Sequence, residues 1–353
     1  MPASCACERS GTIAASIEKR IWNLVTDGTP VVVTSHVNLD GDGVGAVLAL
    51  WHGLRSVGVE CVQYHEPPMP SVLEFLPGLD RRVKNVRQLP RRFHLVAVDS
   101  GTLDRTGALA KKAPQAVRIV NIDHHRTNDR FGHINYVVRD ASSSGELIYK
   151  VLEAGGVPLT PEISLCLYTA IVTDTGRFSY SNTTREAFEI CGRLMRAGVC
   201  PWDLCERLFG SPPDAVVRLM GLTLGTLKLD AGRRVATMEI TDKMFRETGT
   251  HPVDTQGFAD MAIAVQGVAA SALLKEITER GRLKYVKMSL RSRPGDGSVD
   301  VCAVAETFCG GGHRHAAGCE FYGTLAQARK AVVAELRRHL RKARNSGKRP
   351  RGR

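Results

Sequence analysis

The stretch Val117-Arg-Ile-Val-Asn-Ile-Asp-His-His125 decides the fold that we expect for this chain. Its first six residues form an apolar run with two polar interruptions, which predicts a buried β-strand. Asp123, His124 and His125 follow at once, and all three side chains can bind a metal ion. Open α/β sheets build their ligand sites at the carboxyl ends of strands, so the stretch predicts a strand and a site together.

Strand and helix patterns alternate around this stretch. Strands are predicted at 29–35, 59–64, 93–98 and 116–122, and helices at 44–57, 145–154 and 161–174. This alternation is typical of α/β proteins with a doubly wound parallel sheet. After residue 181 the pattern changes, and it predicts helices at 184–197, 258–264 and 325–342 with strands at 234–241 and 283–291.

These segments predict two domains joined by a helix. The helix that joins them is expected to begin with Ser211 as its cap and Pro212 in its first turn. We expect an N-terminal extension, a catalytic domain, a linker helix, a smaller α/β substrate-binding domain and a basic tail, at residues 1–14, 15–209, 210–228, 229–342 and 343–353.

Composition excludes several classes of protein. The chain has 353 residues, of which 43% are hydrophobic and 24% are charged, as in globular proteins. It has no apolar run of membrane-spanning length and no secretory signal pattern, so we expect a cytoplasmic protein. Its ten cysteines include no C-x-x-C pair, which favours reduced thiols. A structural zinc near Cys309, His313, His315 and Cys319 is a weaker alternative.

The positive charge lies mainly at the carboxyl end. The net charge is +12, and the segment Arg337 to Arg353 contains nine lysines or arginines and no acid. Such a tail is too polar to fold alone. Two readings stay open, a solvated terminus and a contact for polyanions such as RNA.

Five more metal-competent side chains lie at the ends of apolar segments, namely His36, Asp40, Asp42, Asp99 and Asp174. A single aspartate in such a place is usually a helix cap or a turn residue. Together, the five predict a metal centre in which Asp40 and Asp42 project to one side of an extended segment. Mixed His/Asp ligands suit Mn²⁺, with Mg²⁺, Co²⁺ and Fe²⁺ as alternatives. Two ions about 3.5–4 Å apart, bridged by a carboxylate, are a common device for phosphoester hydrolysis.

In order along the chain, the motifs resemble those of the DHH phosphoesterase superfamily. His36-x-x-x-Asp40-x-Asp42 is similar to its first motif, Asp99-Ser-Gly to its second, Asp123-His-His to its third and Asp174-Thr-Gly to its fourth. Phe308-Cys-Gly-Gly-Gly-His313 resembles the signature of the associated DHHA1 domain. The nearest likeness is to the nano-RNase/pAp phosphatases, also called bifunctional oligoribonucleases.

The resemblance implies roles for individual residues. It implies two Mn²⁺ ions that share Asp99, the first held also by His36 and Asp40, and the second held also by Asp42, His124 and Asp174. His125 is expected to act on the scissile phosphate, with Asp123 behind the ligands fixing a metal-bound histidine or water. Binding of a distal phosphate or nucleotide is expected from the second domain, through Arg291, Ser292, Gly310, Gly311, Gly312 and His313.

The resemblance also implies an activity. We expect hydrolysis of very short single-stranded RNA from an end, of linear dinucleotides, and of 3'-phosphoadenosine 5'-phosphate, by a homodimer. Cyclic dinucleotide phosphodiesterase, inorganic pyrophosphatase and a catalytically inactive nucleotide-binding regulator remain as alternatives.

Overall fold

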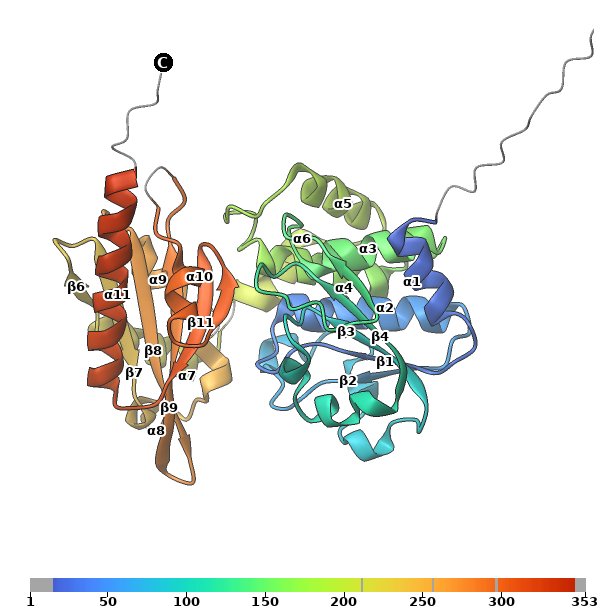
Figure 1. Ribbon diagram of the computed structural model, residues 1–353, viewed down its shortest axis with the longest axis horizontal. Helices are drawn as coiled ribbons and strands as arrows, with labels where there is room; N and C mark the ends of the chain where they lie inside the picture. Colours follow the sequence, from blue (N-terminus) through green and yellow to red (C-terminus); the bar gives the residue numbers. More distant parts are fainter. Residues whose placement is uncertain (1–14, 211, 256, 296–297, 347–353) are drawn as a thin grey trace, which may run out of the picture.

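The computed structural model describes residues 15–210, 212–255, 257–295 and 298–346. Figure 1 shows two α/β bodies side by side, with the catalytic motifs in one and the glycine-rich signature in the other. The predicted fold class is confirmed. The N-terminal extension, the cap residue Ser211 and the last seven residues of the basic tail lie outside the described residues.

The N-terminal sheet has five strands, all parallel, in the order β2-β1-β3-β4-β5. Their bounds are β1 (Val31–Thr34), β2 (Cys61–Tyr64), β3 (Phe93–Val98), β4 (Ala116–Asp123) and β5 (Ile134–Val137). In this strand order, the connections run in opposite directions from β1 and β3. Loops after those two strands therefore diverge and leave a crevice, which is where α/β sheets of this kind bind ligands.

Helices cover one face of this sheet, and the other face is covered mainly by 3₁₀ segments. The helical layer contains α1 (Ile17–Val25), α2 (Gly41–Ser56), α3 (Ser144–Ala154) and α4 (Pro161–Asp174). The opposite face packs against η3 (Val86–Gln88) and η4 (Leu103–Gln115), whereas η1 (Ser71–Leu73) and η2 (Leu79–Arg81) lie in the β2–β3 connection. Close packing of α2 on α4 depends on Gly45, where a Cβ would lie 2.5 Å from the Cys166 carbonyl oxygen.

A series of short elements leads to the second domain. They are α5 (Arg185–Arg196), α6 (Pro201–Cys205), a π-helical turn η5 (Glu206–Gly210) and α7 (Asp214–Gly225). The predicted start of the joining helix is wrong, because Pro213 occupies the N-cap position and the helix begins at Asp214. Pro212 therefore precedes the helix.

The second domain is built on a six-stranded sheet in the order β10-β11-β9-β8-β7-β6. Its strands are β6 (Lys228–Asp230), β7 (Val235–Ile240), β8 (Ala270–Glu279), β9 (Arg282–Ser292), β10 (Gly311–His313) and β11 (Ala316–Phe321). Only β7 and β8 pair in parallel. Its helical segments are α8 (Asp242–Thr248), η6 (Pro252–Thr255), α9 (Phe258–Ala264), α10 (Val301–Glu306) and α11 (Leu325–Ser346).

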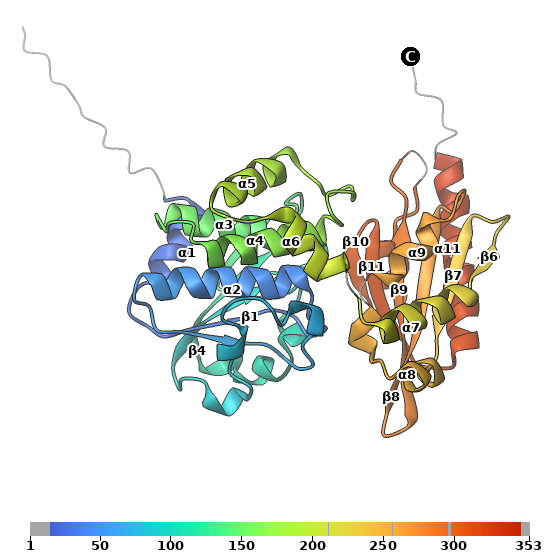
Figure 2. The same cartoon turned by 180° about the vertical axis from the view of Figure 1, so that it is seen from behind.

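The two faces of this sheet have different neighbours. Helices α10 and α11 pack on one face around Val286, Met288 and Leu290 of β9. On the other face, α7 to α9 cover the β7–β8 side, with α9 also reaching β9, and β9 to β11 are turned toward the catalytic domain (Figure 2). Helix α11 continues to Ser346, so the basic tail begins later than residue 343. Within the described residues, no helix has the length and apolarity to cross a bilayer.

Candidate metal centre

Helix α2 begins inside the first motif. Asp40 is its N-cap, and the Asp40 Oδ1 atom accepts a hydrogen bond from the Gly43 N–H at 3.0 Å. The expected extended segment from Asp40 to Asp42 is therefore wrong, because the cap turns the chain into a helix at Gly41. The second oxygen of Asp40 stays free of the cap and lies 3.4 Å from the His36 Nε2 atom.

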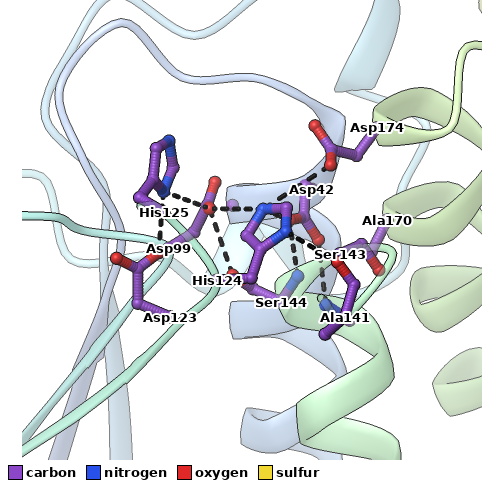
Figure 3. Close-up of polar contacts among 12 residues, drawn as sticks. Asp42, Asp99, Asp123, His124, His125, Ala141, Ser143, Ser144, Ala170 and Asp174 are labelled. Carbon is purple, nitrogen blue, oxygen red and sulfur yellow. Dashed lines mark hydrogen bonds and ion pairs between the residues drawn. The ribbon is translucent and has the colours of Figure 1, made fainter. Parts of the chain in front are cut away.

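Asp99 is at the centre of the site (Figure 3). It follows β3 directly and has a φ of +56°, a left-handed conformation that aspartate tolerates better than most residues. This turn directs its carboxylate inward. The carboxylate oxygens lie 3.2 Å from His36 Nε2, 3.6 Å from His124 Nε2 and 3.5 Å from His125 Nδ1.

Four groups of side chains among the described residues could each hold a metal ion, and the two without His125 consist of expected ligands and share Asp99. One group adds His36 and Asp40, and the other adds Asp42 and His124, with the potential ligand atoms of each group within 4.8 Å of one another. Asp174 lies beside the second group, with its Oδ2 atom 3.5 Å from His124 Nε2. The structure thus brings together the six side chains expected as ligands. No group of this kind among the described residues contains a cysteine.

The two histidines of the third motif are oriented by different partners. His124 Nδ1 lies 3.2 Å from the Ala141 carbonyl oxygen, which turns its Nε2 atom toward the carboxylates. His125 Nδ1 lies 2.7 Å from Asp123 Oδ1. Because an ionised carboxylate can only accept, Nδ1 of His125 carries the proton and Nε2 is left for other partners. Asp123 therefore holds His125, whereas we expected it to support a metal-bound histidine or water.

Several supporting residues are not predictable from the motifs. At the start of α3, the Ser144 and Gly145 N–H groups donate to Asp42 at 2.7 and 2.9 Å, and Ser144 Oγ donates to Asp99 at 3.1 Å. The Asn128 amide donates to Asp123 at 2.6 Å, and the Asn182 amide donates to Asp174 at 3.1 Å. The serine run before α3 was visible in the sequence, but no pattern distinguishes these asparagines from ordinary turn residues.

The carboxylates of the centre strongly perturb one another and the histidines. Burial, together with repulsion from Asp99 and Asp174, raises the pKa of Asp42 well above its usual value. Burial also acts to raise the pKa of Asp99, but hydrogen bonds from His124 and His36 hold that pKa well below its usual range. For His36, burial acts to lower the pKa, yet Asp40 and Asp99 outweigh it and raise the pKa to about 10. The centre therefore attracts positive charge, as a divalent-cation site must.

The second domain contributes His313 directly to this centre. Its ring stacks on His125 with centroids 4.8 Å apart and lies 4.7 Å from the His124 ring. Burial and the two neighbouring histidines hold the pKa of His313 well below its usual value. His313 thus lies beside the third motif. Its expected role at a distal phosphate would place it farther from the metal centre.

The other expected substrate residues differ in their placement. Gly310 to Gly312 run into the edge strand β10, and a Cβ on Gly311 would lie 2.9 Å from Thr127 Oγ1 of the catalytic domain. Arg291 is half-buried on the face of β9 turned toward that domain. Ser292 is not brought to the site: successive strand residues point to opposite faces, and its buried hydroxyl donates to the Val299 carbonyl oxygen at 2.7 Å.

Comparison with known proteins agrees with this architecture. The chain matches the DHH family, N-terminal domain, over residues 30–171 and the DHHA1 domain over residues 233–342. It is 33% identical over 315 residues to the bifunctional oligoribonuclease and PAP phosphatase NrnA of Thermus thermophilus, covering 89% of this chain and 91% of that protein.

Two solved structures are similar as well. An exopolyphosphatase-related protein from Bacteroides fragilis has a TM-score of 0.80 at 26% identity, covering 94% of this chain and 99% of that one. RecJ of Thermus thermophilus in complex with Mn²⁺ has a TM-score of 0.51 at 14% identity, covering 94% of this chain and 55% of that one. The likeness to RecJ concerns the fold alone.

A parallel sheet with a carboxylate–histidine centre, closed by a second domain with a glycine-rich edge strand, defines a two-domain phosphoesterase. The chain belongs to the DHH phosphoesterase superfamily and, within it, to the family of the bifunctional oligoribonucleases and PAP phosphatases.

Proposed function

We propose that this phosphoesterase hydrolyses very short oligoribonucleotides from an end, linear dinucleotides, and 3'-phosphoadenosine 5'-phosphate. The observation that carries the proposal is the position of His313, which stacks on His125 and closes the centre from the side of the second domain. A centre closed in this way accepts the end of a short strand more readily than the middle of a long one. The name of the Thermus relative, an oligoribonuclease and PAP phosphatase, supports two of these substrates, oligoribonucleotides and 3'-phosphoadenosine 5'-phosphate.

We propose that two divalent ions, Mn²⁺ in the first place, complete the centre. Oxygen and imidazole ligands without thiolate fit Mn²⁺, and Mg²⁺, Co²⁺ or Fe²⁺ would fit the same donors. When bound, such ions generate a nucleophile from water near neutral pH and offset the charge on phosphoryl oxygens. The ligands would be Asp99 in common, with His36 and Asp40 on one side and Asp42, His124 and Asp174 on the other.

His125 would then act on the scissile phosphate. Its Nδ1–H is engaged by Asp123, so when the ring carries a second proton, on Nε2, that atom can donate a hydrogen bond to a phosphoryl oxygen or a proton to the leaving oxygen. Stacking against His313 restricts rotation of the ring. Asp123 and His313 thus prepare His125 for the reaction before substrate arrives.

The second domain would bind the part of the substrate beyond the scissile bond. Strand β10 is an edge strand, so backbone N–H groups on its outer side are available to a phosphate. Gly310, Gly311 and Gly312 allow a close approach because they have no side chains. Arg291 would pair with a phosphate, since a guanidinium binds two phosphate oxygens at once. Ser292 is left out of this proposal because its hydroxyl is engaged inside the domain.

A substrate panel tests the proposal. Purified protein with Mn²⁺ would be assayed against pApA, long single-stranded RNA, cyclic di-AMP, pAp and pyrophosphate. We expect pApA to be cleaved fastest, followed by pAp. Fastest cleavage of pyrophosphate, cyclic di-AMP or long RNA would instead support the corresponding alternative enzyme, and binding of nucleotides without cleavage would support an inactive regulator.

Three wider properties also remain proposals, and of these the dimer is what the resemblance implies. We propose a cytoplasmic homodimer with the five-part organisation given above, except that the tail begins after Ser346. Light scattering of the purified chain tests the dimer. If the tail contacts RNA, deleting the tail should weaken RNA binding mainly at low salt, because exposed charges are screened at high salt.

A further inference from the structure

Three side chains form a connected group across the domain boundary. Tyr180 Oη donates to Asp260 Oδ2 at 2.5 Å, and Arg291 Nε donates to Asp260 Oδ1 at 2.7 Å. Tyr180 belongs to the catalytic domain, whereas Asp260 is in the first turn of α9 and Arg291 is on β9. All three are half-buried. Burial and Asp260 raise the pKa of the Tyr180 phenol, which therefore stays a hydrogen-bond donor, while Arg291 opposes that rise.

Tyr180 is fixed at its own end by the turn that follows Asp174. A Cβ on Gly176 would lie 2.3 Å from the Tyr180 ring, so the ring packs directly on the glycine backbone. The Tyr180 N–H also donates to the Thr175 carbonyl oxygen at 2.9 Å. The phenol is therefore held in a definite position relative to the metal centre.

Asp260 alone is a weaker support for Arg291. Both residues lie in one domain, and a partly exposed ion pair stabilises a geometry only modestly because water competes for each charge. The phenol uses the second carboxylate oxygen and reduces the freedom of the carboxylate. Because the phenol comes from the other domain, this support exists only when the two domains are close.

We propose that Tyr180 and Asp260 are positioning residues that form an interdomain clasp with Arg291. The clasp orients Arg291 for a substrate phosphate only when the second domain has closed over the metal centre. This inference rests on the proposed function for the identity of the ligand. It adds one condition to the proposed function: Arg291 is oriented to bind the distal phosphate only when the two domains have closed.

Tyr180→Phe is the central test, because it keeps the ring on Gly176 and removes only the hydroxyl. We expect the KM for pApA to rise roughly tenfold, as expected for one hydrogen bond to a charged group, with kcat changed less than about twofold. The KM for ApA, which lacks the terminal phosphate, should not change. Asp260→Asn should have the same effect.

The matched control is Asp300→Asn. Asp300 forms an interdomain ion pair at 3.6 Å with Arg126, and asparagine can still cap α10 in its place. This variant should leave the preference for pApA over ApA intact. If it reduces that preference as much as Tyr180→Phe does, general loosening of the interface explains both results and the clasp is refuted.

A double-mutant cycle separates positioning from plain structural support. In an Arg291→Gln background, Tyr180→Phe should cause no further rise in KM, because the residue it positions is already gone. Equal rises in both backgrounds would overturn the proposal.

Hydrogen exchange gives a readout that needs no substrate. Tyr180→Phe should speed amide exchange in residues 258–264 and 286–292, and Asp300→Asn should not. If the wild-type enzyme cleaves neither dinucleotide, the proposed function fails and exchange alone decides on the clasp. Unchanged exchange in Tyr180→Phe would rule the clasp out.

Discussion

At the scale of single residues, Asp99 combines two unusual features. Its backbone has a left-handed conformation. It also belongs to both expected ligand groups, the one that contains His36 and the one that contains Asp42. Asp99→Asn keeps the size of the side chain and tolerates positive φ, but it removes the charge. Substitution of residues that only support the metal ligands typically reduces activity roughly 10–100-fold. We expect Asp99→Asn to reduce pApA turnover by more than this, and calorimetry should show that Mn²⁺ binding is lost.

The same substitution should not unfold the protein. Loss of the Asp99 charge removes the repulsion with Asp42, but it also removes the interactions with His124 and His36 that hold the pKa of Asp99 well below its usual range, so the folded state loses a net favourable contribution. The melting temperature without added metal should be lower than that of the wild type, with a cooperative unfolding transition retained. Asp80→Asn, at an exposed acid remote from the centre, serves as the control for loss of an acid in general. Normal Mn²⁺ binding by Asp99→Asn would contradict the shared-ligand assignment.

Lys275 gives a prediction about pH that does not involve the metal centre. Burial and the charge of Lys287 on the paired strand lower the pKa of Lys275 to about 7 from 10.5. The unfolded chain therefore binds more protons between these values, and stability rises with pH in that window. The unfavourable contribution is complete below about pH 7 and is lost as the pH approaches 10.5.

Replacing Lys275 by methionine should remove this pH dependence. Urea unfolding should show that the stability of Lys275→Met relative to wild type falls by about 2 kcal/mol between about pH 7 and pH 9. Lys284→Met, at an exposed lysine, should show no such trend. A difference independent of pH would mean that Lys275 keeps its charge in the folded state, held by the Pro252 and Thr255 oxygens that it contacts.

At the scale of elements, two adjacent serines at the start of α3 have different roles, one in the stability of the helix and the other in metal binding. Ser143 is the N-cap, and its Oγ accepts from the Glu146 N–H at 3.2 Å, whereas Ser144 Oγ donates to Asp99. Ser143→Ala should cost about 1 kcal/mol of unfolding free energy with little change in Mn²⁺ affinity. Ser144→Ala should weaken Mn²⁺ binding by about tenfold with little change in stability. Calorimetry and thermal melts on both variants test the pair, and the opposite pattern would refute it.

Elements with a clear pattern could be predicted, and those set by tertiary contacts could not. Helix α4 runs from Pro161 to Asp174 as expected, because proline marks its start and the apolar pattern is continuous. The start of α2 was placed too late, since its first turn consists of glycines and Asp42, which resemble a loop in sequence. Ser292 was expected at the site together with its neighbour Arg291, although successive residues of a strand point to opposite faces of the sheet.

At the scale of the whole molecule, motif order predicts which residues act together but not how the domains meet. His313 could be assigned to substrate from its glycine-rich context, yet its stacking on His125 depends on the orientation of one domain over the other. Tyr180 and Asp260 lie in unremarkable sequence, and only the closed arrangement makes them partners. Contacts of this kind have no local signal, because each half is an ordinary surface residue until the halves meet.

The close approach of Gly311 to the Thr127 side chain of the other domain offers a test of closure itself. A Cβ added at Gly311 would lie 2.9 Å from Thr127 Oγ1, 3.4 Å from Cγ2 and 3.5 Å from Cβ, so either the threonine or the domain that carries it must shift to admit the methyl group. Gly311→Ala should therefore hold the domains apart. We expect the KM for pApA to rise several-fold and the radius of gyration from X-ray scattering to increase, with Mn²⁺ affinity unchanged.

Relief of the crowding should restore closure. Thr127→Ala removes both of the outer atoms, so the double variant Gly311→Ala/Thr127→Ala should recover most of the wild-type KM. Gly318→Ala is the matched control, because a Cβ there would meet only the Met288 carbonyl oxygen at an ordinary 3.5 Å. If the double variant stays as impaired as Gly311→Ala, glycine is required at position 311 for contact with substrate backbone, and the domain contact is not what limits KM.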